Sequence, residues 1–408
     1  MLLLLFVAMN LQAYRAMHVY YAAGAADFKI YMTAAHMVHD GDASQLYDLG
    51  AQSHTQQLIY PLFPVGNDPL PYNHPAAEAL VFLPLALVAT TPAYYIFFVI
   101  NVLMLFTALF LCRRAMPAWD TQVRLPLMLL AAAFYPVVMC LFLGQDSILL
   151  LLLYALSFHA IRRGHLFFGG LLLGCGCFKP HLVLPFAVLF FVVRRRWKAA
   201  QGFAVGAALV LGSSLWLSGM DGLRGFLRLN AETQQYRTWL FNPHLMADLR
   251  GLIQSVLASQ FSFFPLLLII IIISLIFFTW CVLQLLKIHP PADGRNSDGG
   301  LNIEFSFCVI STVLVAYHVY PYDLTILIIP FLFLLEYAIV IAKKGRVWVL
   351  TGIGFFLLLP LQTIANASQL YFLFALDLLL LAFVSAKWMY DKNDELSQTT
   401  FSTSTRQA

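Results

Sequence analysis

The sequence predicts an all-α polytopic membrane protein, on three observations. Of its 408 residues, 61% are hydrophobic and only 11% are charged, whereas a soluble domain carries about 25% charged residues. The mean hydropathy is +0.79. Apolar runs that approach the roughly 20 residues needed to cross a bilayer recur along the whole chain. An ordinary soluble globular fold is therefore excluded.

The apolar runs predict a bundle of about 12 transmembrane helices, counted to within about one. Residues 165–178, 182–193 and 303–316 form the shortest runs. A further apolar segment, residues 75–90, is interpreted as a partial insertion, because a full crossing would export the arginines at 194–196. The twelve runs are 1–17, 93–112, 125–143, 147–161, 165–178, 182–193, 199–217, 263–286, 303–316, 324–342, 347–365 and 368–386.

The distribution of lysine and arginine predicts the orientation. These residues are retained on the cytoplasmic side when they lie in short loops. Seventeen of the 24 fall in alternate loops, which places both termini in the cytoplasm. The extracytoplasmic side then carries two long loops, about 18–74 and 218–262. We expect a multi-pass protein of the bacterial cytoplasmic (inner) membrane.

The sequence predicts one transmembrane domain over residues 1–390. The start of the chain has no basic region before its apolar run and no small-residue cleavage site, so we interpret it as a first span and not as a signal peptide. Residues 391–408 contain too few apolar side chains to bury, which predicts a disordered cytoplasmic tail.

Several functional classes are excluded. The net charge of +4 comes without a basic block, so nucleic acid is not expected as a partner. The six cysteines lie in apolar runs, with spacings unlike those of zinc sites or disulfide frameworks, and are interpreted as small core residues. The sequence contains no phosphate-binding loop and no dinucleotide fingerprint, so no binding site for a soluble nucleotide is predicted.

Asp27 is the first candidate functional residue. Residues 27–41 are predicted to form a short helix on the membrane surface, with Asp27 as N-cap and Gly41 just beyond its C-terminus. From position alone the cap is the favoured role, but a carboxylate at the lipid boundary is costly, which also suggests a role as general base. The two roles are compatible.

Three short turns on the same side carry the other candidates. Lys179 and His181 could hold an anion such as a phosphate, or Lys179 could reach the headgroups with its long side chain. Gln145 and Asp146 could belong to a site or only to a tight helical hairpin.

The third turn contains His318, Tyr320 and Asp323. Interfacial tyrosines are common whatever the function, whereas a histidine beside an acid can exchange protons near pH 7. A functional and a structural role for His318 are weighed equally. Arg237, on the second long loop, could capture phosphate.

The order of short motifs along the chain resembles glycosyltransferase family 87, whose members have the GT-C membrane architecture. The resemblance rests on Asp27-Phe28 with Tyr31, on Gly144-Gln145-Asp146-Ser147, on Lys179-Pro180, and on His318 with Asp323-Leu324. One departure is Asn73-His74-Pro75, where the family more often has a Pro-Pro pair.

The resemblance implies an inverting glycosyltransferase with a GT-C-like bundle and short interfacial helices in its extracytoplasmic loops. The donor would be a polyprenyl-phosphate sugar carrying a hexose such as mannose, or a pentose, and the acceptor an extracytoplasmic glycan or glycolipid, all within membrane lipid. Asp27 would be the general base, with His318 near the reacting phosphate or acceptor. Phosphate is a good leaving group, so no metal and no cofactor are predicted. The expected donor-phosphate residues are Lys179, His181 and Arg237, and the expected acceptor or cavity residues are Tyr31, Gln145, Asp146, Tyr320 and Asp323.

Two other classes compete with the enzyme. A transporter or flippase of lipid-linked sugars would also have about twelve spans, but predicts pseudo-symmetric halves with a site at the membrane midplane. A non-catalytic membrane scaffold would leave Asp27, Lys179 and His318 free to vary. The clustering of polar residues on one side favours the enzyme.

Overall fold

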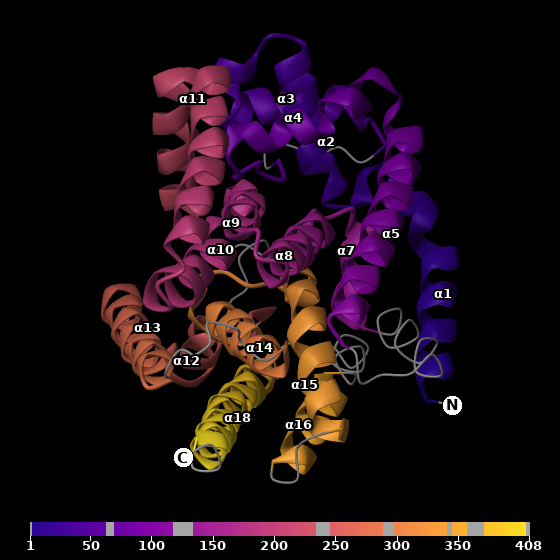
Figure 1. The fold of residues 1–408 in the computed structure, drawn as a ribbon. Helices are drawn as coiled ribbons and strands as arrows, with labels where there is room; N and C mark the ends of the chain where they lie inside the picture. The colour runs from indigo at the N-terminus through magenta and orange to yellow at the C-terminus, as the bar shows by residue number, and fades with distance from the viewer. Residues whose placement is uncertain are drawn as a thin grey trace.

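The computed structural model describes residues 2–62, 69–116, 134–233, 245–288, 298–340, 345–356 and 371–404. Within these ranges the chain is built from helices and contains no strand, which confirms the all-α prediction. Figure 1 shows a tall bundle with its helices at varied tilts. The α-helices are α1 (Leu2–Tyr20), α2 (Phe28–His39), α3 (Leu49–Ile59), α4 (Ala79–Phe82), α5 (Thr90–Arg114), α7 (Tyr135–Leu143), α8 (Ser147–Arg162), α9 (Leu166–Gly174), α10 (Pro180–Phe186), α11 (Trp197–Thr233), α12 (Leu249–Leu257), α13 (Phe263–Leu286), α14 (Asp298–Val315), α15 (Ile328–Val340), α16 (Arg346–Phe356) and α18 (Phe372–Ser404).

Five helical stretches of the described chain are long and apolar enough to cross a membrane. Several shorter apolar helices accompany them, and the total of about 12 spans stays a prediction. The long helices expose large apolar side chains, such as Phe110, Trp216 and Phe264, that a soluble protein would bury. The chain is therefore a membrane protein. The five stretches are Thr90–Arg114, Trp197–Glu232, Phe263–Leu286, Pro321–Val340 and Phe372–Tyr390.

Glycines bring α9 and α11 into close contact. A Cβ atom at Gly170 would overlap the Ala199 carbonyl oxygen, and one at Gly202 would overlap that of Phe167. Small residues allow helix backbones to approach closely where lipid supplies no hydrophobic driving force. This contact fixes α11 beside the helices that lead to Lys179.

The first long loop folds into a helical layer at one end of the molecule. In Figure 1, α2, α3 and α4 lie together beside the far end of α11. Most of α2 is buried, including Lys29 and Thr33, because α3 and α4 pack around it. The sequence predicts that this helix lies on the membrane surface, and the position of the layer at a lipid interface stays a prediction.

The apolar segment after this layer is broken and short. It consists of the 3-10 turn η3 (Ala76–Glu78), α4 and the 3-10 turn η4 (Leu83–Leu87). The helix over Ala76–Leu87 falls below the length of a membrane crossing. Its length agrees with a partial insertion.

Both marked termini lie at the end of the bundle opposite the α2–α4 layer (Figure 1). The helix α18 continues to Ser404, so residues 391–404 are helical where the sequence predicts a disordered tail. Helical backbone satisfies its own hydrogen bonds and does not require apolar side chains. The division into a membrane domain and a cytoplasmic tail stays a prediction.

A buried ion cluster lies near the start of α11. Arg196 donates to Glu304 Oε1 at 2.6 Å, and Arg194 donates to the same oxygen at 3.1 Å. The arginines that serve as topology markers thus also anchor α14. None of the six cysteines forms a disulfide, and only Cys175 is not fully buried, which agrees with their interpretation as core residues.

Candidate functional site

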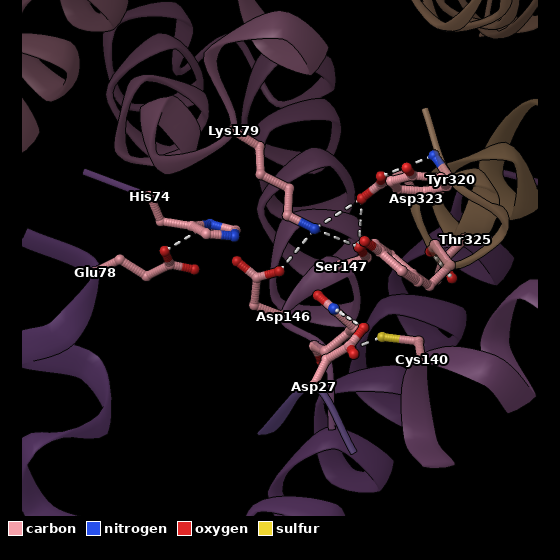
Figure 2. Close-up of polar contacts among 12 residues, drawn as sticks. Asp27, His74, Glu78, Cys140, Asp146, Ser147, Lys179, Tyr320, Asp323 and Thr325 are labelled. Carbon is pink, nitrogen blue, oxygen red and sulfur yellow. Dashed lines mark hydrogen bonds and ion pairs between the residues drawn. The ribbon is translucent and has the colours of Figure 1, made fainter. Parts of the chain in front are cut away.

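The three short turns and the first loop meet in one polar cluster inside the bundle. Figure 2 shows Asp146 and Asp323 joined through Lys179, and hydrogen bonds through Gln145 and Tyr31 link Asp27 to Asp146. These residues come from the start of α2, the α7–α8 turn, the start of α10 and the start of the 3-10 helix η9 (Pro321–Leu327). Segments far apart in sequence are therefore brought to the same place.

Asp27 occupies the predicted N-cap position of α2, but its carboxylate does not cap the helix. Instead, Asp27 Oδ2 accepts a hydrogen bond of 2.7 Å from Gln145 Nε2. Tyr31, one turn further along α2, donates to Gln145 Oε1 at 2.6 Å and so fixes the amide. Gly41 follows the last turn of α2 with a φ of 91°, as predicted for the residue beyond a helix C-terminus.

The α7–α8 turn depends on Gly144. Its φ of 64° places it in the left-handed region, where glycine is favoured, and a Cβ there would lie 2.7 Å from Phe28 Cβ. The close approach brings Gln145 against α2. Asp146 then takes the N-cap position of α8, and its carboxylate also makes no cap hydrogen bond.

Lys179 connects the acids of the cluster. Its Nζ lies 2.7 Å from Asp146 Oδ1 and 2.7 Å from Asp323 Oδ1. It also donates to Ser147 Oγ at 2.7 Å. An ammonium has three protons to donate, so these three contacts occupy them all. Direct binding of a phosphate by Lys179 would require one of them to be replaced.

The ion pairs set the charge states around Lys179. Burial alone would lower the pKa of Lys179, but the adjoining Asp146 and Asp323 carboxylates raise it above its usual value. For Asp146, burial is outweighed by Lys179, so its pKa is lowered. Both groups are therefore charged at pH 7.

The surroundings of Asp27 change its pKa in the direction opposite to that found for Asp146. Desolvation by the surrounding protein raises the pKa of Asp27, although the Gln145 hydrogen bond and the Lys179 charge partly counteract this. Part of the Asp27 surface stays accessible. A carboxylate with a raised pKa that can be reached from outside is suited to accept a proton.

Two histidines of the cluster lie next to each other and interact electrostatically with Lys179. The rings of His181 and His318 are 6.3 Å apart between centroids, and His318 packs edge-on against Tyr320 at 4.5 Å. Burial and His181 lower the pKa of His318 to about 3, so His318 is neutral at pH 7. His181 Nε2 has no hydrogen-bond partner among the described residues.

Accessibility divides the cluster into a floor and a rim. We use "floor" for the buried residues Tyr31, Gln145, Asp146, Lys179 and Asp323, and "rim" for Asp27, His181, His318 and Tyr320, which are partly exposed. The floor residues hydrogen-bond to one another and hold the geometry. The rim residues are the ones that a bound molecule can contact.

Two further residues of the cluster were not predicted from the sequence. His74 Nδ1 lies 2.8 Å from Glu78 Oε2, and Glu78 also faces Asp146 (Figure 2). Burial and the Asp146 charge raise the pKa of Glu78 well above its usual value. An acid within an apolar run marks a functional candidate by default, so Glu78 within residues 75–90 carried a signal that could have identified it.

The structure thus brings together every predicted site residue except Arg237, which lies outside the described residues. Their assignment to base, donor or acceptor roles stays a prediction.

A bundle of membrane helices that encloses a cluster of carboxyl, imidazole and ammonium groups defines a class of integral-membrane protein with a polar reaction or binding site. The chain belongs to glycosyltransferase family 87, whose model matches residues 72–297, more than half of its length. Comparisons with curated proteins and with solved structures give no match. The family match includes the turns with Asp146 and Lys179 and stops short of Asp27 and His318. The protein is a glycosyltransferase, with a sugar donor and an acceptor as its partners.

Proposed function

We propose that the protein transfers a sugar from a polyprenyl-phosphate donor to a glycan or glycolipid acceptor, with inversion at the anomeric carbon and Asp27 as general base. The observation that carries the proposal is the carboxylate of Asp27. It stands at a helix N-terminus without capping it, is held by Gln145 at 2.7 Å, and stays accessible at the rim.

The reaction needs one proton acceptor and one leaving group. An acceptor hydroxyl attacks the anomeric carbon, and its proton passes to Asp27. The bond between the anomeric carbon and the phosphate oxygen breaks, and its electron pair leaves with the polyprenyl phosphate. A positioned general base contributes roughly 10²–10⁴-fold to the rate of such a step.

The donor phosphate is assigned to the histidine side of the rim. His181 Nε2, which has no partner among the described residues, can donate a hydrogen bond to a phosphate oxygen, and His318 lies beside it. Lys179 is assigned a positioning role, because its contacts with Asp146, Asp323 and Ser147 occupy its protons. The apolar helices around the cluster provide the surface along which a polyprenyl chain can lie.

The site is assigned to the extracytoplasmic face of the membrane. The cluster lies next to the first long loop, and the arginine-rich start of α11 lies in a separate ion cluster with Glu304. Retention of arginine on the cytoplasmic side supports this orientation. A lipid-linked donor suits that face, since it is already activated and requires no nucleotide.

The substitution Asp27→Asn tests the proposal. It keeps the shape of the side chain but removes the proton acceptor, so sugar transfer from a polyprenyl-phosphate donor should fall by about 10²-fold or more. Transfer is measured with purified protein and a radiolabelled donor.

The matched control is Asp48→Asn. Asp48 is an aspartate of the same loop that does cap its helix, accepting from Ala51 N at 2.8 Å, and asparagine caps equally well. This variant should transfer sugar at nearly the wild-type rate. An Asp27→Asn protein that keeps more than about a tenth of the wild-type rate would show that Asp27 is not the base.

A further inference from the structure

The His74–Glu78 pair lies beside the proposed reaction centre and has no part in the reaction described above. His74 precedes the broken helix and Glu78 lies in its first turn, and their side chains meet at 2.8 Å. Both point toward Asp146 (Figure 2). The three residues come from two segments, the end of the first loop and the α7–α8 turn.

The donor atoms of these three residues converge. One ring nitrogen of His74 and one carboxylate oxygen each of Glu78 and Asp146 all lie within 4.8 Å of one another. Ligand atoms around a bound transition metal sit about 3–4 Å apart, given metal–ligand distances of about 2.0–2.2 Å. An inward movement of about 1 Å would therefore complete a three-ligand site.

The carboxylates gain unpaired acceptors when Glu78 is ionised. Asp146 Oδ1 pairs with Lys179 at 2.7 Å, and a protonated Glu78 carboxyl hydrogen-bonds the Asp146 carboxylate; without that proton, Asp146 Oδ2 faces no hydrogen-bond donor in the described chain. When Glu78 is ionised, its Oε1 likewise faces no hydrogen-bond donor among the described residues. Glu78 is 3% exposed and Asp146 is fully buried. Buried carboxylate oxygens without a donor are costly unless a cation approaches them.

The charges of the cluster are also unbalanced. With all of its acids ionised, the cluster within the described residues would hold the carboxylates of Asp27, Glu78, Asp146 and Asp323 against the single ammonium of Lys179; burial and the Asp146 charge accordingly raise the pKa of Glu78. The departing group of the proposed reaction would add another negative charge. A divalent cation would supply the positive charge that Lys179 alone does not.

The neighbouring chain holds the ligands in place. Tyr47 donates to the backbone oxygen of His74 at 2.9 Å, and Tyr72 donates to that of Pro75, also at 2.9 Å. Tyr31 contacts Asp146 Oδ1 at 3.2 Å. Ligands fixed by such outer contacts are typical of metal sites.

We propose that His74, Glu78 and Asp146 bind a divalent cation of the Mn²⁺ type. Two carboxylate oxygens and one imidazole nitrogen suit an ion that accepts both hard oxygen and imidazole ligands. Three protein ligands leave coordination positions open for water or for a phosphate oxygen of the donor. This revises the expectation of a metal-free site. Its use in catalysis rests on the proposed function, whereas binding of the ion does not.

The test measures binding of Mn²⁺ to the purified full-length protein after treatment with a chelator. Electron paramagnetic resonance of free Mn²⁺ gives stoichiometry and affinity, and pulsed measurements detect a nitrogen ligand. We expect one bound ion per chain with coupling to an imidazole nitrogen. The substitutions Glu78→Gln and His74→Gln should each weaken binding at least 10-fold, the scale on which metal sites respond to loss of a partner.

His54→Gln and Glu232→Gln are the matched controls, because they make the same changes of side chain at two exposed residues that are not among the proposed ligands. They should bind Mn²⁺ as the wild type does. Wild-type protein that binds no stoichiometric Mn²⁺, or binds it without a nitrogen ligand, overturns the proposal even if the variants fail to fold. A folded Glu78→Gln protein with unchanged affinity also overturns it.

Failure of this proposal and of the proposed function are distinguishable. A protein that binds Mn²⁺ through nitrogen but transfers no sugar supports the metal site and refutes the proposed reaction. Transfer by protein that binds no Mn²⁺ supports the reaction and refutes the metal site.

Discussion

Four aspartates occupy the N-cap positions of α-helices in the described chain, and only two of them cap. Asp48 accepts from Ala51 N at 2.8 Å and Asp248 accepts from Gly251 N at 2.7 Å. Asp27 and Asp146 make no such bond. Both noncapping carboxylates belong to the polar cluster, so their side chains serve contacts between segments and not their own helices.

Gln145 offers a prediction at this scale. Its amide donates to the charged form of Asp27, which lowers the pKa of that carboxyl. Gln145→Met removes the donor with little change in volume, so the pKa of Asp27 should rise. A hydrogen bond to a charged group contributes about 1.5–3 kcal/mol, or about one to two pH units.

The measurement is the pH dependence of kcat/KM. Because the base must be ionised, activity is lost as the pH falls through the pKa of Asp27. The acid limb in Gln145→Met should therefore lie at higher pH than in the wild type, with partial recovery of the rate at high pH. An unchanged acid limb with a uniformly lower rate would indicate a purely structural role for Gln145.

At the scale of single residues, the sequence identified the residues of the site but not the hydrogen bonds and ion pairs between them. Polar side chains in apolar surroundings marked Asp27, Asp146, Lys179 and Asp323, because each is costly there unless it has a partner. Which partner each one takes depends on the packing of separate helices. The occupation of Lys179 by two acids could not be read from spacing along the chain.

Among the contacts between helices, the α9–α11 contact requires glycine most clearly. Gly170→Ala places a methyl group against the backbone of Ala199, while Gly212→Ala on α11 meets no atom within 4 Å. Overpacking costs typically about 1–3 kcal/mol, whereas alanine in an open helix position is favourable.

We therefore expect Gly170→Ala to lower the Tm of the detergent-solubilised protein and Gly212→Ala to leave it unchanged or slightly raised. Thermal unfolding followed by fluorescence-detected gel filtration measures both. Equal Tm values for the two variants would mean that the helices separate without cost at this contact.

The composition and periodicity of the sequence predicted that helices form. They did not predict what surrounds each helix. The helix at residues 27–41 was predicted and is present as α2. Its burial was not predicted, because it results from packing against α3 and α4, which the residues of α2 alone do not indicate. In the same way, the contacts of Glu78 with His74 and Asp146 result from the packing of separate segments.

For the whole molecule, the orientation in the membrane is the main testable property. His54 and Arg163 are both exposed, and the positive-inside pattern assigns them to opposite sides. In a background with Cys175→Ala, the other native cysteines being buried, each position is replaced by cysteine and treated with a membrane-impermeant maleimide.

His54→Cys should be labelled in intact cells and Arg163→Cys only after the membrane is opened. The reverse pattern would place the polar cluster on the cytoplasmic side and contradict the proposed function. Labelling of both positions in intact cells would indicate leaking membranes, which a cytoplasmic marker protein excludes.

The overall architecture was predictable because membrane helices can be recognised in a sequence as long apolar runs. The number of spans was less predictable. Helices such as α9 and α10 are shorter than the bilayer is thick, and whether short helices cross depends on tilt and on their neighbours. The chain alone does not contain that information.

Gly219 interrupts α11 with a φ of 68° and a ψ of −173°. The helical residues before it would rise about 33 Å at 1.5 Å per residue, close to the roughly 30 Å of a bilayer core. A Cβ at this glycine would meet no atom within 4 Å. The angle between the two halves of α11 therefore depends on the main-chain torsion at Gly219 and on the packing of the second half against Tyr47 of the outer layer, and a side chain at Gly219 would strain the backbone without displacing any neighbour.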